Sequence, residues 1–199
     1  MLDGKDAARQ PASMTRILAF ILILLPLEAV AASGCEDIWF TRNLVMDRAG
    51  HCFSSPLGQA VFDNSDCTGT GVQPDAYGTQ VIQQIRALEA QHACRVNTNQ
   101  TWIDLPDIAF RKVLRTHPIF DEFEGGCLGW NGPNTPLYDG YSEPFHQIGQ
   151  IQPGDFVSYG HLPVGEWTYV TIHTANWATF KSAGWLYFPG PDPCVDFAG

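Results

Sequence analysis

The sequence predicts an α+β protein, with a small α-rich N-terminal domain stapled by disulfides and a C-terminal β-barrel domain. Two observations predict this fold class. In residues 35–124 the apolar side chains recur at helical spacing, whereas in residues 127–196 they alternate in short runs that Gly and Pro interrupt. All six cysteines lie in these two segments, and an even number is typical of a disulfide-bonded protein outside the cytoplasm.

Residues 1–32 have the pattern of a secretory signal peptide. Arg16 precedes an apolar stretch from Ile17 to Leu27, and small residues follow it. A bilayer core needs about 20 apolar residues, so this stretch is too short to be a membrane anchor. We therefore predict cleavage after Ala31 or Ala32 and an exported protein, periplasmic or extracellular.

Acylation of Cys35 is the alternative, because Ala32-Ser33-Gly34-Cys35 resembles a lipoprotein site. A lipid on Cys35 would attach the protein to a membrane. It would also leave five of the six cysteines for pairing, an odd number. This imbalance favours cleavage without lipidation.

Four helices are predicted in the N-terminal domain, each from an apolar stripe at helical spacing. Gly50 ends the first, and Ser55 with Pro56 suits the start of the second. The acidic and glycine-rich residues 121–126 predict a flexible boundary after the last helix. The helices are expected at Glu36–Arg48, Leu57–Phe62, Thr79–Arg95 and Ile108–Leu114.

Five short β-prone runs follow, separated by Gly and Pro turns at the spacing of a small barrel. A β unit of about 65 residues is near the size at which one apolar core barely suffices. The strands are expected at Pro136–Tyr138, His146–Ile151, Asp155–Tyr159, Glu166–His173 and Gly184–Phe188.

Cys127 and Cys194 bracket this β unit, so we predict that they form one disulfide that closes it. The other four cysteines allow three pairings, and the choice among them stays open. The simplest division pairs Cys35 with Cys52 and Cys67 with Cys94.

The formal net charge of −10 excludes some classes of partner. Removing residues 1–34 takes away three basic and three acidic residues, so the charge is unchanged by export. Phosphate backbones are repelled by such a field, and no basic stripe opposes it. We therefore expect no nucleic-acid partner, and no membrane partner unless Cys35 is lipidated.

Residues 35–69 resemble the YARHG domain, a small helical module of exported bacterial proteins. The namesake tetrapeptide of that family reads Asp47-Arg48-Ala49-Gly50 in this chain. The resemblance is to a cysteine-bearing subgroup without an established role, so it implies export and a helical fold but no reaction. The matching positions are Trp39, Arg42, Asn43, Gly50 and Phe53.

Residues 129–188 are similar to the bacterial SH3-like barrel. The likeness is carried by the turn segment Ile148–Asp155, the strand Trp167–Val170 and the closing segment Ala183–Leu186. The Asn-Val-Arg opening of that family is replaced here by Pro136–Tyr141. Such barrels commonly bind peptidoglycan or short peptides, so the resemblance implies a recognition module.

The aromatic residues are the main candidates for ligand contact. Trp167 and Trp185 occupy barrel motif positions, so we predict that they lie in the core. Tyr138, Tyr141 and Trp177 fall in turns or at strand edges, where rings can stack on a sugar or grip a peptide. We predict that these three line one groove, with plain packing as the alternative.

Arg42 and Asn43 are the second candidate ligand site, because a guanidinium on the same short helix as Trp39 can recognise a carboxylate. The alternative is structural. Arg42 would then pair with an acid such as Asp63 or Asp66, and Asn43 would hold a loop.

Candidates for catalysis do not form a recognisable motif. A thiol nucleophile would need Cys52 beside His51 or Cys94 beside His92, but exported thiols in even number are usually bridged. The clustered Asp121, Glu122 and Glu124 suit a solvated linker better than a hydrolase site.

The histidines of the β domain could in principle assemble a metal or proton-transfer site with Asp155 and Glu166, but the simpler explanation is that they are scattered over the surface. These histidines are His146, His161 and His173. We therefore expect no catalytic residue, no metal and no cofactor.

Together these features predict a non-catalytic, exported cell-envelope protein that binds peptidoglycan, or an exported peptide or protein, through its β domain. The alternatives are an envelope hydrolase or its accessory factor, and a structural or inhibitory partner of another exported protein.

Overall fold

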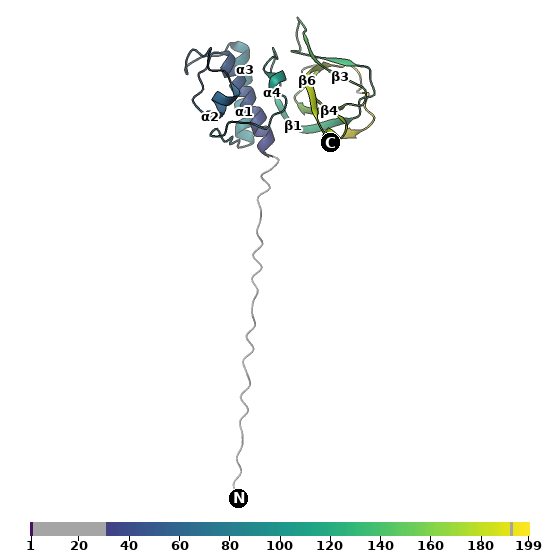
Figure 1. Cartoon of the computed structure of the whole chain (residues 1–199), viewed down its shortest axis with the longest axis horizontal. Helices are drawn as coiled ribbons and strands as arrows, with labels where there is room; N and C mark the ends of the chain where they lie inside the picture. Colours follow the sequence, from purple (N-terminus) through teal and green to yellow (C-terminus); the bar gives the residue numbers. More distant parts are fainter. Residues whose placement is uncertain (2–30, 192) are drawn as a thin grey trace.

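A computed structural model describes residue 1 and residues 31–191 and 193–199. Residues 2–30 of the predicted signal peptide therefore lie outside the described part of the chain, and Met1, Ala31 and Ala32 lie within it. Helices form one side of the protein and a curved sheet forms the other, with α4 between them (Figure 1). In the described residues, no helix is long and apolar enough to cross a membrane.

The four helices begin and end close to the predicted positions. The Ser55 hydroxyl caps α2 by accepting from the Gly58 amide at 3.1 Å. The Asp75 carboxylate likewise caps α3 by accepting from the Gly78 amide at 2.7 Å. The helix α3 ends four residues earlier than predicted, just before Ala93, which has a positive φ of 49°. The helices are α1 (Ala31–Arg48), α2 (Pro56–Val61), α3 (Ala76–Gln91) and α4 (Ile108–Arg111).

Seven antiparallel strands form one sheet, in the order β3-β2-β6-β5-β4-β1-β7. The five predicted strands are all present, as β2 to β6. Within the described residues the edge strands β3 and β7 do not pair with each other, so the sheet is open and an SH3-like barrel is not confirmed. The strands are β1 (Phe120–Leu128), β2 (Thr135–Tyr138), β3 (Gln147–Ile151), β4 (Phe156–His161), β5 (Trp167–His173), β6 (Phe180–Tyr187) and β7 (Phe197–Ala198).

The acidic, glycine-rich segment 121–126 is part of β1, so the predicted flexible boundary is wrong. Gly125 and Gly126 pair with Tyr159 and Ser158 of β4. Glycine lowers the propensity of a strand but does not prevent its backbone from joining a ladder. The tertiary pairing therefore overrides the local sequence signal.

The two faces of the curled sheet bury different residues. Its concave face encloses an apolar core to which strands from across the sheet contribute, including Leu137, Val157 and Ile172. Its convex face packs Tyr169 and Trp185 against Leu114, which follows α4. Trp185 is thus buried as predicted, but on the outer face and not in the interior of the curl. Trp167, which was also predicted to lie in the core, is only partly buried.

Three disulfides staple the fold. The Cys127–Cys194 bridge is confirmed. The predicted pairing of the other four is wrong, because Cys52 bonds to Cys67 and Cys35 bonds to Cys94. The helices α1 and α3 pack antiparallel, which brings the start of one beside the end of the other. Since the Cys35 sulfur is used in a disulfide, it is not available for acylation.

The Arg111 side chain joins the helices to the sheet inside the protein. It donates to Asp37 Oδ1 of α1 and to Asp107 Oδ2, each at 2.8 Å, and it also contacts Asp37 Oδ2. His161 Nε2 of β4 lies 3.0 Å from Asp37 Oδ2, and the Tyr169 hydroxyl of β5 donates to Asp107 Oδ2 at 2.9 Å. These five almost wholly buried side chains, named here the Arg111 cluster, set how the helices sit on the sheet.

The charges of the Arg111 cluster support one another. Burial alone would raise the pKa of Asp37, but Arg111 and His161 hold it well below its usual range. Burial would lower the pKa of Arg111, but Asp107 and Asp37 raise it well above its ordinary value. The stability that Asp37 contributes is therefore present above the ordinary carboxylate pKa and is lost as the pH falls below it.

Replacing Arg111 with Ala should lower the free energy of unfolding by about 3 to 5 kcal/mol, because two buried carboxylates lose their cation. Urea unfolding at pH 7 measures the change. Arg86→Ala is the matched control, because Arg86 is exposed on α3, and it should change stability by less than about 0.5 kcal/mol. Equal effects of the two substitutions would show that the Arg111 cluster does not hold the helices and the sheet together.

Replacing both Cys127 and Cys194 with Ser should loosen the sheet more than the helices. The bridge closes a loop with a sequence separation of 67 residues, for which the chain-entropy model gives roughly 4 kcal/mol. Limited proteolysis should cut the sheet first in the double variant. Unchanged protease resistance of the sheet, or a non-reduced peptide map with other cysteine pairs, would contradict this assignment.

Candidate functional site

Two loops on one side of the sheet shape the surface that carries the candidate site. They are the β2–β3 loop, residues 139–146, and the β4–β5 loop, residues 162–166. The buried Asp139 ties the first loop, because its carboxylate accepts from the His146 amide at 3.2 Å and from Arg115 Nε at 3.0 Å. These hydrogen bonds, with the Arg115 charge, hold the pKa of Asp139 below its usual value although burial acts to raise it.

An aromatic ladder of four rings lies across the ends of β2, β5 and β6. Trp167 is its centre, with Phe145 stacked on it at a ring-centroid distance of 5.0 Å and an interplanar angle of 25°. Tyr187, opposite Trp167 in the β5–β6 pairing, lies at 5.0 Å. Tyr138 contacts Phe145 at 5.6 Å and Trp167 at 5.9 Å. Phe145 and Tyr187 are 40% and 44% exposed, so the ladder presents rings to solvent.

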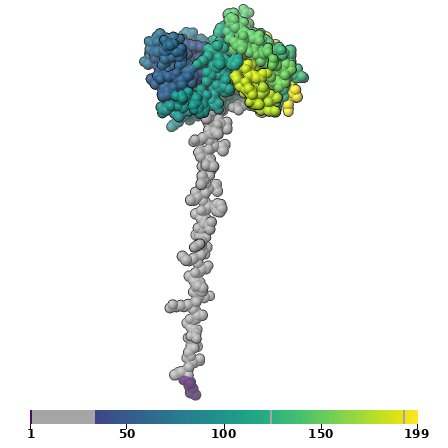
Figure 2. All heavy atoms as spheres, viewed as in Figure 1, coloured from purple at the N-terminus to yellow at the C-terminus, as the bar shows by residue number. Residues whose placement is uncertain are grey.

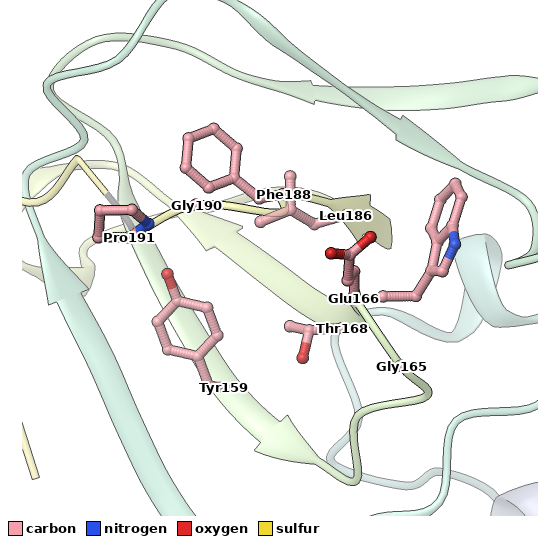
Figure 3. A pocket seen from close by; sticks show the side chains of 9 residues that line it. Tyr159, Gly165, Glu166, Thr168, Leu186, Phe188, Gly190 and Pro191 are labelled. Atoms are coloured by element: carbon pink, nitrogen blue, oxygen red, sulfur yellow. The ribbon is translucent and has the colours of Figure 1, made fainter.

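A hollow of about 400 Å³ adjoins the ladder at Trp167 and is named here the mouth hollow. Figure 3 shows its side chains, which come from β4, the β4–β5 loop, β5, β6 and the segment after β6. Among the described residues that line it, Glu166 is the only acidic or basic side chain. The lining includes Tyr159, Glu166, Trp167, Thr168, Leu186 and Phe188.

Glu166 links the hollow to the ladder. Its Oε2 accepts from the Tyr187 hydroxyl at 3.0 Å. This hydrogen bond and the adjacent negative charge raise the pKa of Tyr187. The Tyr187 hydroxyl therefore keeps its proton, and the exposed carboxylate of Glu166 still has acceptor positions for a ligand.

A second hollow, of about 290 Å³, lies between α3 and the two loops and is named here the seam cleft. Tyr77 and His117 line it, and both also line a neighbouring hollow of about 240 Å³ that contains Arg48 and Arg115. The two loops contribute Tyr141, Leu162 and Val164 to the seam cleft, and α3 contributes Gln80 and Gln84.

The three rings predicted to line one groove have different neighbours, and no ring contact in the described residues joins any two of them. Tyr138 belongs to the aromatic ladder. Tyr141 packs edge-on against Trp185 at 4.8 Å and lines the seam cleft. Trp177 packs against Phe156 at 5.3 Å, in a short turn where its φ is 60°. The three rings therefore do not form one cluster, and the shared groove, like ligand contact by each ring, stays a prediction.

Arg42 and Asn43 have partners within the protein. Arg42 Nε donates to Glu89 of α3 at 2.8 Å, in place of the Asp63 or Asp66 of the structural alternative. Asn43 is buried and its amide donates to the Trp39 carbonyl, one turn back in α1, at 2.7 Å. Their local geometry is that of helix packing, and a role in ligand binding stays a prediction.

The histidines of the β half lie in three different environments. His146 contacts Asp139 at 2.8 Å, His161 belongs to the Arg111 cluster, and His173 packs against Trp177 at 5.2 Å. Among the described residues, no three His, Cys, Asp or Glu side chains are grouped so that they could hold a metal ion.

Sequence reasoning missed Phe145 and Tyr187 of the ladder and the residues that α3 gives to the seam cleft. Local sequence carries no signal for the ladder, because Trp167 and Tyr187 meet only through strand pairing. A signal did exist for the cleft. Tyr77, Gln80 and Gln84 recur at intervals of three and four residues, which puts them on one face of α3.

Comparison with known families divides the chain between residues 90 and 93, at the end of α3. The YARHG domain is found at residues 21–90, so that resemblance is confirmed. Residues 93–199, more than half of the chain, match a domain of unknown function, DUF4453. The chain belongs to the DUF4453 family. No curated protein and no solved structure matches it.

The DUF4453 match includes α4 and the whole sheet, so it starts well before the domain boundary that the sequence predicted at 124–127. The ladder and the mouth hollow lie entirely within the DUF4453 domain. The Arg111 cluster and the seam cleft take residues from both domains. YARHG domains are typical of exported proteins, and the three disulfides fit a location outside the cytoplasm.

Arg48 and His117 form a second contact between the YARHG and DUF4453 domains. Arg48 donates to the carbonyls of Leu114 and Lys112, at 2.5 and 3.2 Å, beyond the end of α4. Its Nη1 lies 3.1 Å from His117 Nε2. Burial, and then the charges of Arg48 and Arg111, lower the pKa of His117 to about 3. His117 is therefore neutral in the folded protein at ordinary pH.

Acidification should lower the free energy of unfolding through His117, which joins the two domains. Its pKa is about 3 in the folded protein and ordinarily 6.5, so the unfolded chain binds more protons between these values and stability falls as the pH falls. Between pH 7 and pH 5 the loss should be about 2 kcal/mol. His117→Gln, which accepts from Arg48 but does not titrate, should lack this part of the loss. Urea unfolding at both pH values measures it, and equal pH dependence in the two proteins would contradict the assignment.

Proposed function

We propose that the protein is a non-catalytic, exported cell-envelope protein that binds peptidoglycan through the aromatic ladder and the mouth hollow. The observation that carries the proposal is the ladder itself. Four rings contact one another at the edge of a hollow, and two of them are more than one-third exposed. Rings that only fill a core are not left exposed in this way.

The ladder and the hollow offer complementary chemistry for a wall fragment. Exposed ring faces supply apolar contact area at a low cost in side-chain entropy, which suits a sugar face or a short peptide. Glu166 and Thr168 supply polar groups that can orient hydroxyl or amide groups of the ligand. A hollow that combines aromatic and aliphatic side chains with a few placed polar groups is a common setting for ligand binding.

Two further observations support a role in recognition. The segments Trp167–Val170 and Ala183–Leu186 are similar to the SH3-like barrel, whose members commonly bind peptidoglycan or peptides. We propose that the curled sheet is a divergent module of this kind. The YARHG domain and the disulfides support export to the compartment that contains the cell wall.

Changing Phe145 to Ala should weaken retention on purified peptidoglycan by about 1 to 3 kcal/mol, because a stacking anchor is lost. The melting temperature should change little, since this ring lies at the surface. Sedimentation of the protein with washed wall material, at low and at moderate salt, measures retention. Phe197→Ala on β7 is the matched control, because Phe197 is 59% exposed and outside the ladder.

The proposal requires the two phenylalanine variants to differ. It is rejected if the unmodified protein is not retained on peptidoglycan at either salt concentration, or if both variants lose retention equally. Trp185→Ala marks the behaviour of a core residue. It should cost about 3 to 5 kcal/mol of stability, because Trp185 is fully buried.

A polypeptide partner is the second candidate function. It is favoured by exposed apolar side chains beside the short edge strand β7, namely Val195 and Phe197. A short sheet edge can pair with an extended segment of another protein. Cross-linking in the envelope, followed by mass spectrometry of peptides that contain Val195, distinguishes this candidate from wall binding.

A further inference from the structure

The seam cleft has the geometry and the chemistry of a second binding site. We infer that it takes a neutral saccharide of one or two sugar rings. This site is separate from the aromatic ladder, and the inference does not depend on wall binding by the ladder. Its walls come from the YARHG domain on one side and from the DUF4453 domain on the other.

One wall is a stripe of α3. Tyr77, Gln80 and Gln84 follow one another at intervals of three and four residues, so they share a face of the helix, and all three line the cleft. Gln80 and Gln84 are exposed, and within the described residues neither amide has a hydrogen-bond partner. Each amide can therefore both donate to and accept from a bound hydroxyl group.

The opposite wall comes from the two loops of the sheet. Tyr141 of the β2–β3 loop is held against Trp185, and the exposed Leu162 and Val164 belong to the β4–β5 loop. These side chains offer an apolar surface facing the amides of α3. A sugar ring has the matching form, because its hydroxyl groups point outward around the ring while its C–H groups form the faces.

None of the described residues that line the cleft carries a charge at neutral pH. Its titratable lining consists of tyrosines and His117, and the low pKa of His117 keeps the imidazole neutral. Burial raises the pKa of Tyr77, so its hydroxyl keeps its proton. The nearby cations Arg48 and Arg115 line the neighbouring hollow and not this one. A charged ligand would lose its hydration here without gaining an ion pair, and a neutral ligand would not.

Size and backbone geometry restrict the ligand further. A volume of about 290 Å³ is at the lower end of the range for small-molecule pockets, which suits one or two sugar rings. An extended peptide would need a free strand edge for main-chain hydrogen bonds. The lining includes a helix face, loop side chains and Trp185 of β6, and β6 is paired with β2 and β5 on its two sides, so the described lining offers no such edge.

Binding of N,N′-diacetylchitobiose to the full-length exported protein, measured by isothermal titration calorimetry, tests the inference. Gln80→Ala and Gln84→Ala should each weaken the affinity about threefold to tenfold, the effect of one lost hydrogen bond. Gln83→Ala is the matched control, because Gln83 is exposed on the same helix but does not line the cleft, and its affinity should be unchanged. Phe145→Ala should also leave the affinity unchanged, because Phe145 lies in the ladder.

Four results would overturn the inference. The first three are the absence of measurable binding, an equal loss of affinity in the Gln83 and Gln84 variants, and stronger binding of an acetylated, uncharged tripeptide than of the disaccharide. Loss of affinity in the Phe145 variant alone would assign the disaccharide to the ladder and would also overturn it. The Gln84 variant is also tested for retention on peptidoglycan. If it is retained, a loss of disaccharide binding concerns the seam cleft alone and leaves the wall-binding proposal standing.

Discussion

The structure depends on one buried cation, Arg111, and the two carboxylates that neutralise it. A guanidinium without its partners would be very costly in the protein interior, so Asp37 of α1 and Asp107 beside α4 must lie where they do. His161 and Tyr169 extend the cluster into β4 and β5. The Arg111 cluster therefore fixes the orientation of the helices on the sheet as well as their distance from it. An apolar interface of the same area would fix this orientation less strictly.

The position of the helices on the sheet divides the outer face of the sheet into a part that the helices cover and a part that they leave uncovered. Tyr169 and Trp185, under the helices, are fully buried. Trp167 and Tyr187 continue the same face beyond the helices, and there the rings form the aromatic ladder at the surface. The seam cleft lies near the edge of the covered part. Both candidate sites thus follow from how far the helices extend over the sheet.

Local patterns predicted the elements that local energetics control. The helices α2 and α3 begin at the capping residues Ser55 and Asp75, and the strands β2 to β6 match alternating runs. The strand β1 was missed because Gly125 and Gly126 have little strand propensity, and only pairing with β4 makes them part of a sheet. The Cys35–Cys94 bridge was missed for a related reason, since it depends on antiparallel packing of α1 on α3.

The sequence alone determined the α+β class, the order of most elements, the Cys127–Cys194 bridge and a resemblance to the YARHG domain that the family comparison confirms. Most of these features rest on periodicity, composition and short motifs, which act between residues close in the chain, whereas the bridge was predicted from the positions of its two cysteines at the ends of the β unit. Only the tertiary structure decided which aromatic rings meet, which carboxylates neutralise Arg111, and which face of α3 borders the seam cleft. Those relations join residues many positions apart, such as Asp37 and His161. Their energies arise only when folding brings the groups together and removes them from water.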